Sequence, residues 1–195
     1  MKVGMLSYLR LMIKDYLAKE YTMVELTTPI DEETIGRLKV GDTIKISGYI
    51  LCGRDAVLPK VLKMIEEGKV DSLVFDLHGQ VVFHTAVSPA GVGPTSSNKL
   101  EIESSIEPLS AAGVKIHLGK GELHPETIVA LDKHNSVYAV IPPVTALLEA
   151  KTIERKVLAF PELGMEALHI IKVDKYPAII GAAQGKSIYT RESNT

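Results

Sequence analysis

The sequence is poor in cysteine and in aromatic residues. Of its 195 residues one is cysteine, none is tryptophan and 5% are aromatic. Because Cys52 is the only cysteine, no disulfide can form within the chain, which fits the reducing cytoplasm. One thiolate alone cannot hold an iron–sulfur cluster or a structural zinc ion. If the protein works with such a cluster, another chain must supply the ligands.

The chain also lacks an excess of charge of one sign and a long uninterrupted apolar run. Its 22 basic and 24 acidic residues give a net charge of −2, so no basic surface predicts binding to nucleic acid. The apolar stretch within residues 1–22 is interrupted by Arg10, Lys14 and Asp15, which argues against a membrane span and a signal peptide. Apolar residues at helical spacing predict an amphipathic helical extension there, with a natural start at Met23 as the alternative.

Several well-known catalytic and metal-binding motifs are missing. The six histidines show no HExxH spacing, and neither a GxSxG nor a GxGxxG motif is present. Most of the histidines are therefore interpreted as ordinary surface or core residues. His84 is the one to follow, because it ends a predicted buried strand beside a long loop. A lowered thiol pKa is conceivable for Cys52 beside Arg54, but a buried, inert thiol is the simpler interpretation.

What is present is typical of a globular α/β domain. Hydrophobic residues make up 46% of the chain and charged residues 24%, and we expect one domain over residues 23–195. Because predicted strands and helices alternate, a mostly buried sheet is expected, with ligand-binding loops after its strands. The predicted helices cover residues 31–38, 54–68, 98–112, 124–135 and 144–154, and the predicted strands cover residues 43–52, 81–86, 114–121, 136–143, 167–173 and 177–182.

The segment VGPTSSNKLE, residues 92–101, combines a rigid turn, a row of hydroxyl groups and a cation at a predicted helix start. Thr95, Ser96 or Ser97 can cap the helix by accepting hydrogen bonds from its first N–H groups. The same N–H groups and the helix dipole can bind a carboxylate or phosphate, to which Lys99 would add a full charge. Spacing alone favours the plain cap over the anion site.

Two further loops place a cation directly after a predicted strand. Lys120 stands between two glycines in LGKGEL, where the backbone can approach an anion; a simple strand–helix turn is the alternative. Arg54 in CGRDA can hold a carboxylate through two parallel hydrogen bonds, and Asp55 can cap the helix or hold Arg54 in place; a local surface ion pair is the alternative. Loops of this kind that met in space would form a site for a small polyanion.

These loops, together with residues 157–180, resemble segments of one known family of enzymes. GPTSSNKLE is similar to the GPTTSxRM segment of the β subunit, or C-terminal half, of class I fumarate hydratases and of the related L-tartrate dehydratases. CGRDA resembles their ARDA segment, LGKG their IGKG segment, and VLAFPELGMEALHIIKVDKYPAII their VLAYxELGMEAIW…VxDFPA signature. The resemblance runs from about Val24 to the C-terminus and leaves residues 1–23 outside it.

The resemblance implies a swivelling β/β/α domain that takes part in the reversible addition of water to the double bond of a small dicarboxylate. In that family the α subunit, or N-terminal half, holds a four-iron four-sulfur cluster through three cysteines, and the open iron binds substrate. The single cysteine of this chain, Cys52, agrees with a cluster that is held by the other subunit. The implied assembly is a heterotetramer of two α and two β subunits, with a homodimer as a form of the isolated chain and with no nucleic-acid or membrane partner.

The same resemblance assigns roles to individual residues. Thr95 matches the threonine that takes part in proton abstraction together with an aspartate from the other domain. Arg54 and Lys120 match the cations that bind the substrate carboxylates. Lys99 stands where the family usually has arginine, which keeps the charge but loses the planar fork. Ser96, where a difference between substrates would be sought, is also assigned to substrate binding.

Together with Lys99, two further departures from the family pattern bear on substrate choice. Leu58 stands where many members have histidine, and His84 with Thr85 replaces an expected Tyr-x-Gly-Pro-like segment. Ser96 and the loop at residues 84–92 are where a difference between malate and tartrate would be sought. These two acids differ by one hydroxyl group, and a site built to bond that group can discriminate strongly.

Two hypotheses from different classes follow. In the first, the chain is the β subunit of a class I iron–sulfur fumarate hydratase, which hydrates fumarate to (S)-malate only together with its α subunit; an L-tartrate dehydratase β subunit differs from it only in substrate. In the second, the chain is a non-catalytic anion-binding or assembly module. The amphipathic stretch at residues 1–22 and the missing cysteines allow this second interpretation.

Overall fold

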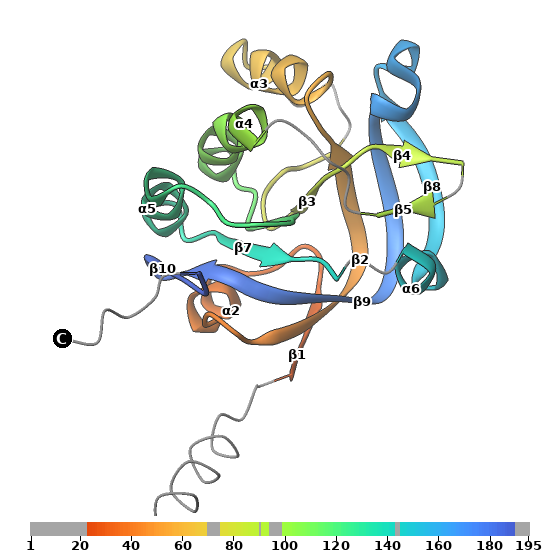
Figure 1. Ribbon diagram of the computed structural model, residues 1–195. Helices are drawn as coiled ribbons and strands as arrows, with labels where there is room; N and C mark the ends of the chain where they lie inside the picture. Colours follow the sequence, from red (N-terminus) through yellow and green to blue (C-terminus); the bar gives the residue numbers. More distant parts are fainter. Residues whose placement is uncertain (1–22, 70–74, 90, 94–98, 143–144, 190–195) are drawn as a thin grey trace, which may run out of the picture.

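The computed structural model describes residues 23–69, 75–89, 91–93, 99–142 and 145–189 (Figure 1). Strands and helices alternate along much of this part of the chain. The strands are β1 (Met23–Thr27), β2 (Thr43–Gly53), β3 (Val81–His84), β4 (Val87–Ser88), β5 (Gly91–Val92), β6 (Ile116–Gly119), β7 (Val137–Val140), β8 (Thr152–Ala159), β9 (Leu168–Ala183) and β10 (Lys186–Ser187). The helices are α2 (Glu32–Arg37), α3 (Leu58–Glu66), α4 (Lys99–Ala111), α5 (Pro125–Lys133), α6 (Thr145–Ala150) and the 3-10 helix η2 (Pro161–Glu166).

Five strands close into a small barrel. β2, β3, β6 and β7 lie side by side and parallel, and β9 runs antiparallel to both β7 and β2, so that it joins the two ends of this parallel row. β1 extends the sheet beside β2, while β8 and β10 pair with β9. The sequence predicted a buried sheet but not its closure into a barrel.

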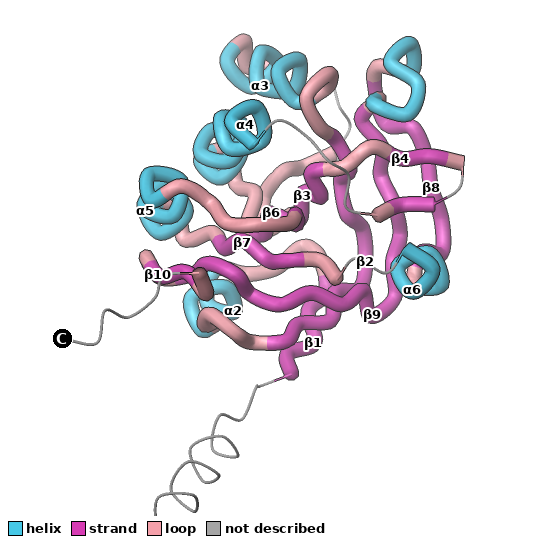
Figure 2. The backbone as a smooth tube through the Cα atoms, in the orientation of Figure 1, coloured by secondary structure: helices cyan, strands magenta, loops and turns pink. Residues whose placement is uncertain are grey.

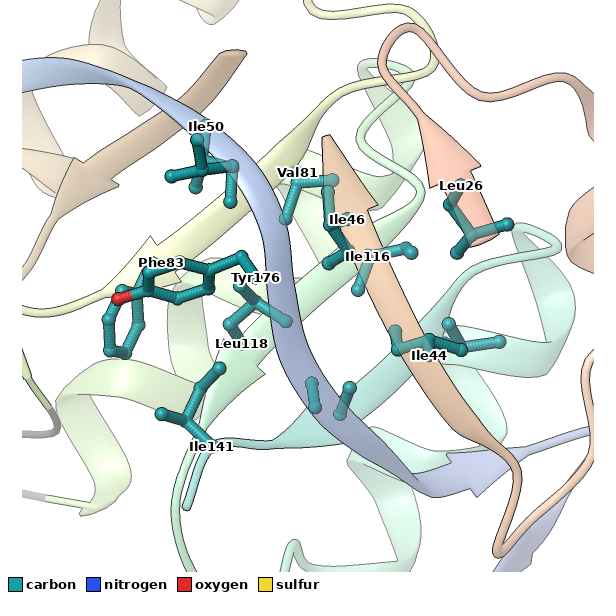
Figure 3. Close-up of a cluster of buried hydrophobic side chains, with 14 of the residues drawn as sticks. Leu26, Ile44, Ile46, Ile50, Val81, Phe83, Ile116, Leu118, Ile141 and Tyr176 are labelled. Carbon is teal, nitrogen blue, oxygen red and sulfur yellow. The ribbon is translucent and has the colours of Figure 1, made fainter. Parts of the chain in front are cut away.

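The barrel interior is apolar and tightly filled. Alternate residues of the strands point inward, and their branched side chains belong to the largest buried cluster among the described residues (Figure 3). The ring of Phe83 meets that of Tyr176 edge-on, with 6.3 Å between the ring centroids. The labelled members of this cluster are Leu26, Ile44, Ile46, Ile50, Val81, Phe83, Ile116, Leu118, Ile141 and Tyr176.

Helices α3, α4 and α5 lie next to one another along the outside of the parallel strands (Figure 2). Their boundaries follow the sequence signals. Pro59 lies in the first turn of α3 and Pro125 begins α5, where a missing N–H costs no hydrogen bond. Gly68, with a φ of 66°, follows the end of α3. No helix among the described residues is long and apolar enough to cross a membrane.

Two sequence predictions about the C-terminal half were wrong. A helix was expected over residues 144–154, but α6 ends at Ala150 and strand β8 begins at Thr152, because this segment pairs with β9. Two strands were expected at residues 167–173 and 177–182, yet β9 is continuous over 16 residues. β9 passes through Pro177 while pairing with β2.

Candidate active site

The ends of the four parallel barrel strands form one edge of the sheet, which we call the carboxyl edge. Arg54 follows β2 and Lys120 follows β6, and β3 lies between these two strands. Neighbouring strands are about 4.8 Å apart, so the backbones that carry the two cations are separated by roughly 10 Å. The structure therefore brings Arg54 and Lys120 to the same edge, as the sequence analysis required of a site for a small polyanion.

The other predicted site residues lie wholly or partly outside the described part of the chain. Thr95 and Ser96 fall within residues 94–98, which the structure does not describe. Lys99 is the first residue of α4, but its side chain is outside the description. The described chain reaches Gly93 just before this segment, and the hydroxyl group of Thr85 donates a hydrogen bond of 2.6 Å to the carbonyl oxygen of Gly93. This bond ties the start of the segment to the end of β3.

Arg54 is held between two carboxylates. Its Nη2 atom lies 2.9 Å from Oδ2 of Asp55, and its Nε atom lies 3.3 Å from Oε1 of Glu166 in η2. The side chain of Arg54 is 17% exposed and that of Glu166 is 37% exposed. A guanidinium group has five N–H donors in a planar fork, so it can hold these carboxylates and still bind an incoming one. The pairing with Asp55 is the local ion pair considered from the sequence, but both side chains are largely buried rather than at the surface.

The backbone around Arg54 explains why a glycine precedes it. A Cβ atom on Gly53 would lie 2.8 Å from a methyl group of Val57 and 3.1 Å from one of Leu58. Glycine at this position thus lets the start of α3 pack closely against the end of β2. The carbonyl oxygen of Arg54 accepts hydrogen bonds from the backbone N–H groups of Val57 and Leu58, at 3.0 and 2.9 Å. These contacts hold the backbone at Arg54 between the end of β2 and the start of α3.

Lys120 is exposed at the turn between β6 and α5. Gly121 has a φ of 81°, a conformation that favours glycine and that allows the chain to reverse directly after the lysine. The turn is anchored to α4 by the buried carboxylate of Glu103. This carboxylate accepts hydrogen bonds from the backbone N–H of His124 at 2.9 Å and from the hydroxyl of Thr127, and it lies 2.9 Å from Nδ1 of His124. The position of Lys120 is thereby coupled to α4.

A row of buried polar side chains leads from α4 to the carboxyl edge. Nε2 of His84 lies 3.0 Å from Nδ1 of His117, and Nε2 of His117 lies 2.9 Å from the hydroxyl oxygen of Ser110. Sequence reasoning singled out His84 but missed His117 and Ser110. The available signal was that His84 and His117 alternate with apolar residues on their strands, so they face away from the barrel interior. These two strands prove to be neighbours in the sheet.

Burial controls the protonation of these histidines. Burial lowers the pKa of His84 to about 4, against a smaller opposing effect of the Asp55 carboxylate. Burial and the neighbouring His84 hold the pKa of His117 well below its usual value. Both rings are therefore neutral at pH 7, so each carries one N–H donor and one nitrogen acceptor.

The described residues do not fit an iron–sulfur cluster. Cys52 is fully buried in the barrel, and burial raises the pKa of its thiol, which makes a thiolate ligand unfavourable. Within the described ranges, no group of three or more His, Cys, Asp or Glu side chains could hold a metal ion. The burial of Cys52 that was expected from the sequence is confirmed.

The sequence of this chain is similar to those of several known proteins. The L(+)-tartrate dehydratase subunit beta of Escherichia coli (strain K12) is 28% identical over 166 residues, which are 80% of each chain. The putative L(+)-tartrate dehydratase subunit beta of Methanocaldococcus jannaschii is 29% identical over 185 residues, covering 87% of this chain and 91% of the relative. The anaerobic class I fumarate hydratase of E. coli is 29% identical over 171 residues, which are 83% of this chain but 31% of that enzyme.

A family model covers most of the sequence. The model described as "Fumarase C-terminus" matches residues 9–192. This match extends further towards the N-terminus than the resemblance noted from the motifs, which began at about Val24. It includes both cations of the carboxyl edge and the segment that contains Thr95. The chain is therefore a member of the fumarase C-terminus family.

Proposed function

We propose that this chain is the β subunit of a class I iron–sulfur fumarate hydratase, which converts fumarate reversibly to (S)-malate together with a cluster-bearing α subunit. The observation that carries the proposal is the placement of Arg54 and Lys120 on neighbouring loops of the carboxyl edge, within a chain of the fumarase C-terminus family. The backbones that carry these two cations lie roughly 10 Å apart, and two cations placed in this way suit a substrate with a carboxylate at each end.

In this proposal, the residues of the β subunit bind and orient the dicarboxylate. Arg54 offers one carboxylate a planar pair of N–H donors, and Glu166 and Asp55 hold the fork in position. Lys120 neutralises the second carboxylate, and Lys99 and Ser96 add a charge and a hydroxyl donor. Holding both ends of the substrate fixes the reacting carbon atoms, which lowers the entropic part of the barrier.

Thr95 is the residue we assign to proton transfer. Dehydration of malate removes a proton from one carbon and hydroxide from its neighbour, and hydration reverses both steps. A hydroxyl group is a weak base at its ordinary pKa, so Thr95 needs a neighbouring carboxylate to accept its proton. We propose that an aspartate of the partner subunit fills this role.

The cluster belongs to the partner in this proposal. The side chains described above do not suit it, whereas subunit beta in the names of two relatives implies a further subunit for those proteins. When bound, a four-iron four-sulfur cluster supplies a Lewis acid for the substrate hydroxyl. We further propose a heterotetramer of two α and two β subunits, in which this chain acts as a swivelling β/β/α domain that brings its carboxyl edge to the partner's cluster.

L-tartrate dehydration is the second candidate function. Its specific support is that two relatives that match this chain over 80% and 91% of their own length are named as an L(+)-tartrate dehydratase subunit beta and a putative one. The site residues would keep the same roles, because malate and tartrate present the same two carboxylates. A non-catalytic anion-binding module remains the alternative from another class.

An anaerobic assay of the assembled enzyme tests these proposals. The chain is co-produced with a three-cysteine α subunit, the cluster is reconstituted, and fumarate, malate and L-tartrate are offered in turn. We expect turnover only when both chains are present. We also expect Thr95→Ala and Arg54→Ala to lower kcat/KM by at least about 100-fold. Arg37→Ala is the matched control, because Arg37 is an exposed cation on α2 that pairs with Glu33.

The outcomes separate the candidates. Turnover of L-tartrate without fumarate would assign the chain to the second function. Full activity of Thr95→Ala would indicate that residues 92–101 form only a capped helix start and that Thr95 has no catalytic role. A complex with no activity on any of the three acids would favour the non-catalytic module.

A further inference from the structure

The row formed by Ser110, His117 and His84 ends at an atom for which the described residues offer no partner. Nδ1 of His84 is buried and has no hydrogen-bond partner in the described part of the protein. His84 as a whole is 2% exposed, so bulk water does not solvate this nitrogen. His84 is the last residue of β3 and pairs with Gly53, the residue just before Arg54. The unsatisfied nitrogen therefore lies at the carboxyl edge, next to the candidate site.

The hydrogen bonds of the row determine which nitrogen carries the proton. Ser110 is 3% exposed, and in the described structure its hydroxyl has one hydrogen-bond partner, Nε2 of His117. A buried hydroxyl must donate its hydrogen, so Nε2 of His117 accepts. The proton of the neutral His117 ring then sits on Nδ1 and is donated to Nε2 of His84. By the same reasoning, the proton of His84 sits on Nδ1, which makes this atom a donor.

A second buried atom without a described partner belongs to Asp55, two residues after the Gly53 that pairs with His84. Oδ1 of Asp55 is buried and has no hydrogen-bond partner among the described residues, while its Oδ2 atom is bound to Arg54. The Asp55 carboxylate is also the charged group that acts electrostatically on His84. An N–H donor and a carboxylate acceptor together suit a hydroxyl group, which can accept one hydrogen bond and donate another. A carboxylate in the same place would be repelled by Asp55.

We infer that His84 is a further substrate-binding residue, whose Nδ1–H donates a hydrogen bond to a hydroxyl group of a hydroxy-dicarboxylate. Oδ1 of Asp55 accepts the hydrogen of that hydroxyl, and His117 and Ser110 are positioning residues that fix the tautomer of His84. This inference rests on the proposed function, because it adds a contact to the same site. It makes His84 a determinant of specificity between acids with hydroxyl groups and acids without them.

The tautomer is tested on the full chain without substrate. Nitrogen-15 NMR of the histidine rings distinguishes protonated from unprotonated ring nitrogens. At pH 7 we expect His84 and His117 to be neutral, with the proton on Nδ1 in both. In Ser110→Ala the hydroxyl donor is absent, so we expect the two rings to populate both tautomers. Observation of His84 with its proton on Nε2, or of a charged ring at pH 7, would overturn the inference.

The contact is tested on the assembled enzyme with two matched variants. In His84→Asn the amide N–H lies near the position of Nδ1, whereas in His84→Gln the amide reaches towards His117 and leaves Nδ1 without a replacement. L-tartrate, with two hydroxyls, and succinate, with none, are used as competitors of the acid that the wild-type complex converts. We expect His84→Gln to raise the inhibition constant of L-tartrate by about 10- to 100-fold and that of succinate by less than about threefold. His84→Asn should stay within about threefold of wild type for both.

The results distinguish the inference from the proposed function. Equal weakening of both competitors in His84→Gln would indicate a structural role and would overturn the inference alone. Unchanged inhibition constants in both variants would also overturn the inference alone. That result would be consistent with a water molecule that joins His84 to Asp55. A wild-type complex that converts and binds none of these acids would overturn the proposed function, and the inference with it.

Discussion

Strands β3 and β6 present two faces that differ sharply in chemistry. The face turned to the barrel interior carries only apolar side chains, which belong to the largest buried cluster. The opposite face, under α4, carries two histidines that form a hydrogen-bonded row with a serine of that helix. The inward residues are Val81, Phe83, Ile116 and Leu118, and the outward histidines are His84 and His117.

The difference shows how one pair of strands can serve stability and function at once. Because side chains alternate between the two faces, a strand can fill a dry interior with one set of residues and hold polar groups with the other. The interior is expected to govern folding and to be indifferent to pH. The outer layer, which runs to the carboxyl edge, is expected to govern binding and to respond to pH.

The largest expected effect concerns the interior. Phe83 is fully buried against Tyr176, so Phe83→Ala should leave a cavity and lower the free energy of unfolding by about 3–5 kcal/mol. Urea denaturation of the isolated chain measures this change. Val129→Ala is the control, because Val129 is 66% exposed on α5 and its truncation should cost less than about 0.5 kcal/mol. Equal effects of the two changes would contradict the assignment of the interior as the main source of stability.

At the carboxyl edge we expect loss of activity without loss of stability. Arg54→Lys keeps a positive charge beside Asp55 but removes the planar fork. In the assembled enzyme kcat/KM should fall by about 10- to 100-fold, while the free energy of unfolding of the chain changes by less than about 1 kcal/mol. Steady-state kinetics and urea denaturation of the same preparation give both values. If Arg54→Lys lost stability and kept its activity, Arg54 would serve folding rather than substrate binding.

The histidine row should make stability depend on pH. The pKa of His84 is about 4 in the folded protein and near 6.5 in the unfolded chain, so between these values the unfolded chain binds more protons. Stability is thus fully present above pH 6.5 and is lost as the pH falls towards 4. From pH 7 to pH 5 we expect a loss of about 2 kcal/mol from His84 alone.

Denaturation at several pH values checks this expectation. His84→Gln should lose less stability over the same interval than the wild-type chain. His78→Gln is the matched control, because the side chain of His78 is 81% exposed, and it should follow the wild type. If stability depended on pH equally in the wild type, His84→Gln and His78→Gln, the dependence would arise from groups other than His84.

The smallest effect is expected away from both faces. Asp31 caps α2 by accepting a hydrogen bond of 2.7 Å from the backbone N–H of Thr34. Asp31→Ala should lower the free energy of unfolding by about 1 kcal/mol and leave kinetics of the assembled enzyme unchanged. Glu33→Ala, which removes only an exposed ion pair with Arg37, should cost less than about 0.5 kcal/mol. A change in kcat/KM for Asp31→Ala would show that α2 influences the site.

The sequence predicted local features well because local chemistry determines them. The helices expected over residues 54–68 and 124–135 are found as α3 and α5, with Pro59, Gly68 and Pro125 at their boundaries, and the cations Arg54 and Lys120 were expected directly after strands. In each of these cases a few neighbouring residues contain the whole signal: a missing N–H, a positive φ or a turn after a strand.

Features that depend on distant partners could not be predicted in the same way. The segment TIERKVLA, residues 152–159, contains good helix formers and becomes a strand only because β9 offers it a partner. The contact between His117 and Ser110 requires α4 to pack on β6, which no local pattern encodes. Barrel closure likewise depends on β9 reaching both β7 and β2.

The position of β9 in the chain has a consequence for biosynthesis. Thr43 in β2 pairs with Ile179 in β9, so the barrel wall joins segments that leave the ribosome far apart in time. Until β9 has emerged, β2 and β7 each keep an open edge that can pair with other chains. Contacts of such long sequence separation also form slowly. A nascent chain that stalls before β9 is therefore expected to need a chaperone, and assembly with a partner must wait until β9 has been synthesised.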